Sequence, residues 1–247
     1  MAKLNPVFSG IRASEGYSTA ASVQGVAKKT FLLFGIAVLS ALLSLTVFAD
    51  IVYGSFAGLI LVFIGALVFG IIGQVSPNAS KVCSIGYAIC EGAVLGLISI
   101  SFESEVNGII QTAVLLTGTI FGVMLLLYST NIVRATERFV RVMAGIGLTI
   151  IIIGLVYLIS FIINPNNALV EAFAYYPGLI VLMSVIILLY AAFMLIMDFE
   201  EVNRIVANGF DEKYEWMAAL GLMVTVVWIY IEVLRLLYIL YQLYDRN

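Results

Sequence analysis

The sequence predicts an all-α polytopic membrane protein, a bundle of seven transmembrane helices. Of its 247 residues, 63% are hydrophobic and only 11% are charged, whereas a soluble domain is nearer half apolar and a quarter charged. Uncharged stretches of about 18 or more residues, long enough to cross the hydrocarbon core of a bilayer, recur along the chain. The mean hydropathy of +1.13 leaves too little polar surface for a water-soluble particle. We therefore expect the lipid bilayer to be its principal partner.

The apolar runs define the seven helices in chain order. They lack the apolar–polar alternation of membrane β-strands, and all four prolines, which break helices, lie outside them. The sixth helix is expected to continue to Ala207 and to end at Asn208-Gly209, a favourable helix C-terminus. Residues 1–28 form a polar N-terminal segment, and residues 29–247 form a single transmembrane domain. The predicted spans are 30–49, 52–73, 83–101, 108–129, 142–163, 178–198 and 216–243.

The basic residues predict the orientation of the bundle. Ten of the twelve Lys and Arg precede the first span or lie in the loops after the second, fourth and sixth spans. The loops on the other side carry only acidic charges, at Asp50, Glu103, Glu105 and Glu171. Because cytoplasmic loops carry an excess of Lys and Arg, we expect a cytoplasmic N-terminus and an outside C-terminus.

The cysteines and the absence of histidine exclude several kinds of chemistry. Cys83 and Cys90 are seven residues apart on a predicted helix, so their Cα atoms would lie about 10 Å apart, too far for a disulfide. Without histidine, Ser-His-Asp and Cys-His catalysis are impossible, and zinc or haem sites lack their usual ligands. We expect neither an enzyme nor a cofactor. No basic arm indicates a nucleic-acid partner.

Pairs of glycines four residues apart recur in the predicted spans. Small residues at this spacing let helix backbones approach closely in lipid. The pairs are interpreted as packing positions within the bundle, with a dimerisation face as the alternative. They are Gly54/Gly58, Gly92/Gly96 and Gly118/Gly122.

Ionisable residues within the spans are the candidates for function, because charges are costly in the membrane and usually face the bundle interior. Glu91 lies in the third span, Glu232 and Arg235 lie in the seventh, and Asp198 ends the sixth. From their distances to the span ends, Glu91 and Glu232 are predicted to lie near the middle of the bilayer at similar depth. A buried acidic site for a proton or a cation is one interpretation. A salt bridge that locks the seventh helix to the third is the other.

The seventh span carries its small, polar and charged residues on one helical face. Gly221, Thr225, Trp228, Glu232 and Arg235 recur at steps of three and four residues, which places them on the same side. This face is expected to point toward the protein. Glu232 and Arg235, three residues apart, can pair.

Several segments resemble the bacterial Bax-inhibitor-like membrane proteins. The run Trp216–Leu237 is similar to the last span of that family, and Met197–Val202 is similar to the segment a few residues upstream. Tyr87–Gly96 resembles the third span. Asn5–Phe8 and Gly16–Thr19 fit the bacterial branch of the family. The resemblance extends over nearly the whole chain, with the motifs in the expected order.

This resemblance implies a compact bundle in which a central helix is wrapped by the others, and a pH-sensitive calcium leak across the membrane. In the family, two aspartates on the sixth and seventh spans share a proton. Asp198 matches the first aspartate, whereas the second position falls on Thr225, so the two-aspartate latch does not carry over intact. The resemblance and the mid-membrane charges together make Glu232 with Glu91 the replacement pair, with transient contacts to calcium.

The leading functional prediction is a cation leak or channel, with calcium as the permeant ion, in the cytoplasmic membrane of a bacterium. Protonation of Glu91, Asp198 and Glu232 would gate it, with Arg235 and Thr225 as their partners. A proton-coupled transporter of a small solute is one alternative. A non-transporting regulator that binds other membrane proteins, such as a membrane protease, is another. The sequence leaves the oligomeric state open.

Overall fold

The computed structural model describes residues 19–46, 56–164, 167 and 177–245, which form seven long α-helices. All seven are long and apolar enough to cross a membrane, so the predicted spans are confirmed. Residues 47–49 and 52–55 of the first two predicted spans lie outside the described residues. The helices are α1 (Val23–Thr46), α3 (Phe56–Val75), α4 (Ser80–Glu105), α5 (Ile109–Ser129), α6 (Glu137–Ile163), α8 (Pro177–Ala207) and α9 (Lys213–Asp245).

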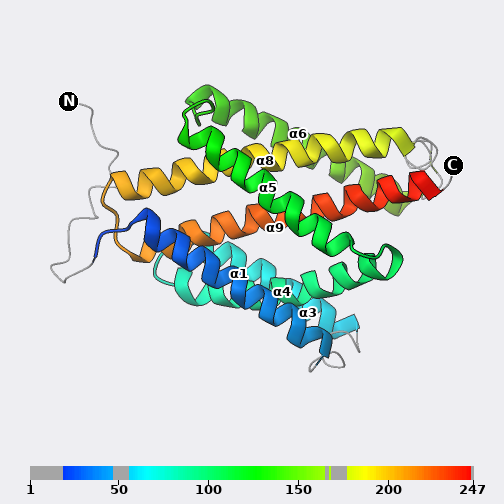
Figure 1. The fold of residues 1–247 in the computed structure, drawn as a ribbon, viewed down its shortest axis with the longest axis horizontal. Helices are drawn as coiled ribbons and strands as arrows, with labels where there is room; N and C mark the ends of the chain where they lie inside the picture. Colours follow the sequence, from blue (N-terminus) through cyan, green and yellow to red (C-terminus); the bar gives the residue numbers. More distant parts are fainter. Residues whose placement is uncertain (1–18, 47–55, 165–166, 168–176, 246–247) are drawn as a thin grey trace.

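The last helix, α9, is the centre of the bundle (Figure 1). It packs against α8, α1, α5, α4 and α3. Leu220, Met223, Ile229 and Leu234 of α9 are completely buried. The central helix that the family resemblance implied is therefore present, and it is the C-terminal one.

α8 ends where the sequence predicted, just before Asn208-Gly209. The helix ends at Ala207, and Gly209 adopts a left-handed conformation with φ of 64°. The Asn208, Gly209 and Phe210 amides donate to the Arg204, Val206 and Ile205 carbonyls, which satisfies carbonyls that a helix end would otherwise leave free.

The glycine pairs behave differently from one another. A Cβ on Gly92 would lie 2.8 Å from the Ala37 Cα, and one on Gly96 would lie 3.2 Å from the Ala41 Cα. These two glycines let the α1 and α4 backbones touch, which confirms the packing interpretation for this pair. By contrast, a Cβ on Gly118 or Gly122 of α5 would meet nothing within 4 Å. Gly54 lies outside the described residues.

The chain enters α1 and leaves α9 at opposite ends of the long axis (Figure 1), as an odd number of spans requires. Which end faces the cytoplasm stays a prediction. Cys83 and Cys90 are both free thiols, as their spacing predicted.

Candidate functional site

A small cavity that contains a few polar side chains lies between α3, α8 and α9. Its volume is about 240 Å³. It contains two of the predicted site residues, Asp198 of α8 and Thr225 of α9, although the two are distant in sequence. The lining consists of Gln74, Met194, Asp198, Glu201, Ile205, Met217, Ala218, Gly221, Val224 and Thr225.

Asp198 is the acidic group in this cavity with unused hydrogen-bonding capacity. Its side chain hydrogen-bonds with Thr225, but its buried Oδ2 atom has no hydrogen-bond partner among the described residues. Gly221 leaves the space open, because a Cβ there would lie 3.4 Å from Gln74 Nε2 and 3.8 Å from Asp198 Oδ1. Buried oxygens normally have a partner. This one is therefore available to a proton, a water molecule or a cation.

The two neighbouring glutamates are both engaged elsewhere. Glu201 Oε2 lies 2.5 Å from Arg204 Nη2, so its charge is compensated at the rim of the cavity. Glu200 points the other way and accepts a hydrogen bond of 3.0 Å from the Tyr128 hydroxyl. Asp198 is therefore the acidic lining residue that has no ion pair in the described part of the chain.

Glu232 and Arg235 form the predicted pair, with 2.7 Å between Glu232 Oε2 and Arg235 Nη2. The Glu232 side chain is 8% exposed and that of Arg235 is 42% exposed, and Trp228 also hydrogen-bonds Glu232. The Trp228 ring packs edge-on against Tyr190 of α8. Thr225 and Glu232 are both buried. The face of α9 that carries them therefore points toward the protein, as predicted.

Glu91 lies half-buried in α4 and acts electrostatically on Tyr87 and Cys90. No basic side chain pairs with it within the described residues. Neither Glu91 nor Glu232 lines the Asp198 cavity. A joint site of Glu91 and Glu232 stays a prediction, as does a transient calcium contact there. Across the described ranges, no three or more Asp, Glu or Cys side chains cluster as metal ligands would.

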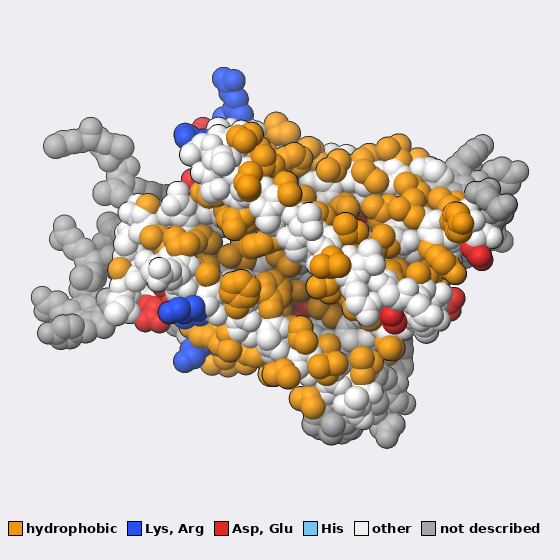
Figure 2. Space-filling view, viewed as in Figure 1, with side chains coloured by type: hydrophobic (Ala, Val, Ile, Leu, Met, Phe, Trp, Pro, Cys, Tyr) orange, Lys and Arg blue, Asp and Glu red, His pale blue; other side chains and the backbone are white. Residues whose placement is uncertain are grey.

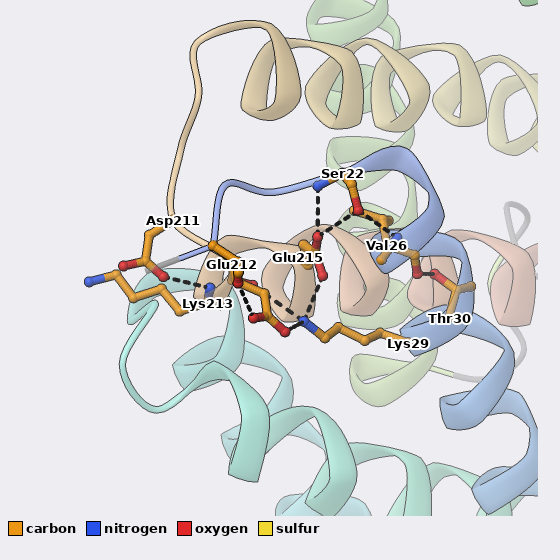
Figure 3. Close-up of polar contacts among 10 residues, drawn as sticks. Ser22, Val26, Lys29, Thr30, Asp211, Glu212, Lys213 and Glu215 are labelled. Atoms are coloured by element: carbon orange, nitrogen blue, oxygen red, sulfur yellow. Dashed lines mark hydrogen bonds and ion pairs between the residues drawn. The ribbon is translucent and has the colours of Figure 1, made fainter. Parts of the chain in front are cut away.

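A second polar cluster, at the start of α9, was missed by the sequence analysis (Figure 3). Lys29 Nζ of α1 lies 2.6 Å from Glu215 Oε2 and 3.0 Å from Glu212 Oε1. The backbone N–H and the hydroxyl of Ser22 both donate to Glu215 Oε1, at 2.7 and 3.1 Å. The Lys29 and Glu215 side chains are only 13% and 4% exposed. This cluster is a buried ion pair whose acidic member is fully hydrogen-bonded.

The contacts around this pair join three helices, α1, α4 and α9. The Lys29 and Lys81 amines lie 5.4 and 5.9 Å from the centre of the Trp216 ring, within the range of cation–π attraction. Any side chain at Gly25 would collide with the Glu215 carboxylate. Hydrogen bonds from Thr19 and then Lys29 hold the pKa of Glu212 below its usual range. No sequence signal revealed the ion pair, because its members are 186 residues apart.

In a comparison with known families, the chain matches the model described as Bax inhibitor 1 like over residues 5–242. In comparisons with curated proteins and with solved structures, nothing matches the chain significantly. The match covers nearly the whole chain, including the Asp198 cavity and the Lys29–Glu215 ion pair.

Proposed function

Because the chain belongs to the Bax inhibitor 1 like family, whose members are membrane proteins often linked to ion leak, we propose that it is a pH-sensitive cation leak. Calcium is the proposed permeant ion, and the cytoplasmic membrane of a bacterium is the proposed location, with the N-terminus in the cytoplasm. The activity needs neither a cofactor nor a catalytic step.

The observation that carries this proposal is the Asp198 carboxylate in its cavity. A carboxylate within a membrane-spanning helix is costly and favours a functional role. Its Oδ2 atom lacks a partner, and Thr225 holds the side chain in place. When protonated, Asp198 is neutral and α8 can close on α9. When ionised, it attracts a cation into the cavity.

The second acidic group is Glu232 with Glu91, deeper in the bundle. If ionised together with Arg235, the three carry a net charge of −1, since one arginine neutralises one carboxylate. The other carboxylate then takes a proton or binds a cation. In this proposal the pair titrates in two steps that belong to both residues, and calcium contacts it transiently during passage.

Calcium flux into vesicles containing the purified protein, measured at several pH values, tests the proposal. Asp198→Asn should change the pH dependence of the flux without lowering the melting temperature of the same preparation. Glu137→Gln is the matched control, because Glu137 is an exposed carboxylate paired with Arg141. A folded Asp198→Asn protein with an unchanged pH profile would show that Asp198 does not gate the flux.

The Glu91–Glu232 pair is tested on the same vesicles. Glu232→Gln and Glu91→Gln should each weaken the pH-sensitive flux, and the double variant should be little worse than either, because the two act as one site. A loss of melting temperature with normal flux in both variants would instead identify a structural salt bridge.

One observation favours a second function, as a regulator that binds other membrane proteins. In the described part of the chain, α6 packs mainly against α8, through Phe139 on Phe193 and Gly147 under Tyr190. The rest of its apolar surface is open. Crosslinking from cysteines placed along α6 in living cells separates the two functions, since a regulator gives a discrete crosslinked protein and a leak gives lipid alone.

A further inference from the structure

A large groove runs along the bundle between α1 and α5, separate from the Asp198 cavity. Its volume is about 1380 Å³, above the range of about 300–1,000 Å³ of sites for drug-sized molecules. α1 packs mainly on α4 and α9, and α5 packs mainly on α8 and α9, so α9 forms the floor and the other two helices form the walls. Figure 2 shows this face hollowed between α1 and α5, with hydrophobic side chains around the hollow.

Away from its polar end, the groove is lined mainly by apolar side chains and is open along one side. Its rim carries large hydrophobic side chains that are mostly exposed, among them Phe31, Val38, Leu42 and Val114. The floor is formed by Leu222, Val226, Val227 and Tyr230 of α9. The groove follows α1 from Val23 to Leu45, about 33 Å at the helical rise per residue. An apolar trough of that length facing the hydrocarbon core is suited to an acyl chain, not to an ion that needs oxygen ligands.

One end of the groove is polar and carries both signs of charge. Arg134 and Glu200 line it together with Asn131, Asn203 and Tyr128. Both charged groups act electrostatically on the Tyr128 hydroxyl, yet the Arg134 side chain forms no ion pair or hydrogen bond within the described residues, where only its backbone carbonyl accepts a bond, from the Thr136 amide. The end thus presents a free guanidinium and, close by, a carboxylate that accepts only one hydrogen bond there.

We propose that this groove is a binding site for a zwitterionic aminophospholipid, with one acyl chain between α1 and α5 and its headgroup at Arg134 and Glu200. The guanidinium matches the lipid phosphate, for which arginine is the preferred partner. The Glu200 carboxylate matches the lipid ammonium. An anionic headgroup with a single phosphate charge would also satisfy Arg134 but would supply no cation for the Glu200 carboxylate, so the two charges together favour the zwitterion.

The glycine pair of α5 provides a matched test. A side chain on Gly118 would meet nothing within 4 Å and would enter the groove that this residue lines. Gly122, one turn further, is equally unobstructed but does not line the groove. Gly118→Leu therefore fills the site, whereas Gly122→Leu makes the same change outside it. Val114→Trp, at the exposed rim, is the second filling variant.

The experiment uses the full chain reconstituted in vesicles of equal parts phosphatidylethanolamine and phosphatidylglycerol, then extracted in detergent and examined by native mass spectrometry. The wild-type protein should retain one phosphatidylethanolamine. Gly118→Leu and Val114→Trp should lower retention about tenfold, the equivalent of about two buried methylenes. Gly122→Leu should not lower it.

Headgroup variants test the polar end. Arg134→Gln should lower retention of both lipids, with the exposed Arg138→Gln as its control, and Glu200→Gln should remove the preference for phosphatidylethanolamine. A wild-type protein without retained lipid, or equal retention in the Gly118 and Gly122 variants, would overturn the proposal. A preference for phosphatidylglycerol would overturn the headgroup assignment. If native mass spectrometry showed a second copy of the chain and no lipid, the proposal would be wrong and the groove would be a dimer interface.

Discussion

Helices α9 and α6 are both long and apolar, yet they occupy opposite environments. In their most apolar stretches, 61% of the α9 residues are buried inside the bundle against 6% of those in α6. The mean hydropathy runs the other way, at 2.1 for α9 and 2.8 for α6. In lipid, apolar side chains gain little by leaving the hydrocarbon, so small and polar residues mark the interior. The buried Glu215, Thr225 and Glu232 of α9 place it at the centre.

The largest expected effect comes from the ion pair that fixes the start of α9. Lys29→Met leaves Glu215 buried without its counter-charge, so we expect a loss of about 3–5 kcal/mol in the free energy of unfolding. Reversible unfolding in mixed detergent measures it. Lys28→Met is the control, because Lys28 is exposed and lies beside Lys29. A stability equal to that of the control would show that the buried pair does not hold α1 to α9.

Leucine truncation measures the contrast between the two helices directly. Leu220→Ala removes a completely buried side chain of α9 and should cost about 2–4 kcal/mol through the cavity it leaves. Leu155→Ala makes the same change on α6, where the side chain is 51% exposed, and should stay within about 0.5 kcal/mol. The same unfolding assay applies. Equal losses at the two sites would mean that α6 is covered, for example by a second copy of the chain.

A smaller effect is expected from a polar contact of α9 inside the bundle. The Tyr230 and Ser99 hydroxyls are 2.9 Å apart and join α9 to α4. Tyr230→Phe should cost about 0.6 kcal/mol, the average that double-mutant cycles give for hydrogen bonds between membrane helices. A double-variant cycle with Ser99→Ala isolates the bond. Additive losses in that cycle would refute the coupling.

The smallest effect is a pH dependence at the edge of the α9 cluster. The folded-state pKa of Glu212 lies below its unfolded value. Its contribution to the stability of the folded state is therefore fully present above the unfolded pKa of about 4.3. It is lost as the pH falls through the folded pKa. Melting temperatures from pH 7 to pH 3 should fall less steeply in Glu212→Gln than in the wild type. Parallel curves would show that the exposed contacts to Thr19 and Lys29 contribute nothing.

Contacts between residues close in sequence were easier to predict than contacts between residues far apart in sequence. The Glu232–Arg235 pair follows from a separation of three residues on one helix, and the protein-facing side of α9 follows from helical periodicity. The end of α8 at Ala207 follows from Asn208-Gly209. The Lys29–Glu215 pair joins opposite ends of the sequence, and both residues look like ordinary loop charges flanking a span. The resemblance to the family brought Asp198 and Thr225 together, but it gave no indication of Gln74 in the same cavity.

By itself, the sequence determined that this chain forms seven helices in a membrane, because uncharged runs of that length satisfy their backbone hydrogen bonds in lipid only as helices. It also determined that α8 ends before the Asn208-Gly209 pair. Only the tertiary structure decided which helix is central, that the Asp198 carboxylate lines a cavity with one oxygen unpartnered, and where a groove stays open between α1 and α5. Those outcomes depend on how side chains from separate helices fit together, and in lipid neither hydrophobicity nor periodicity selects one neighbour over another.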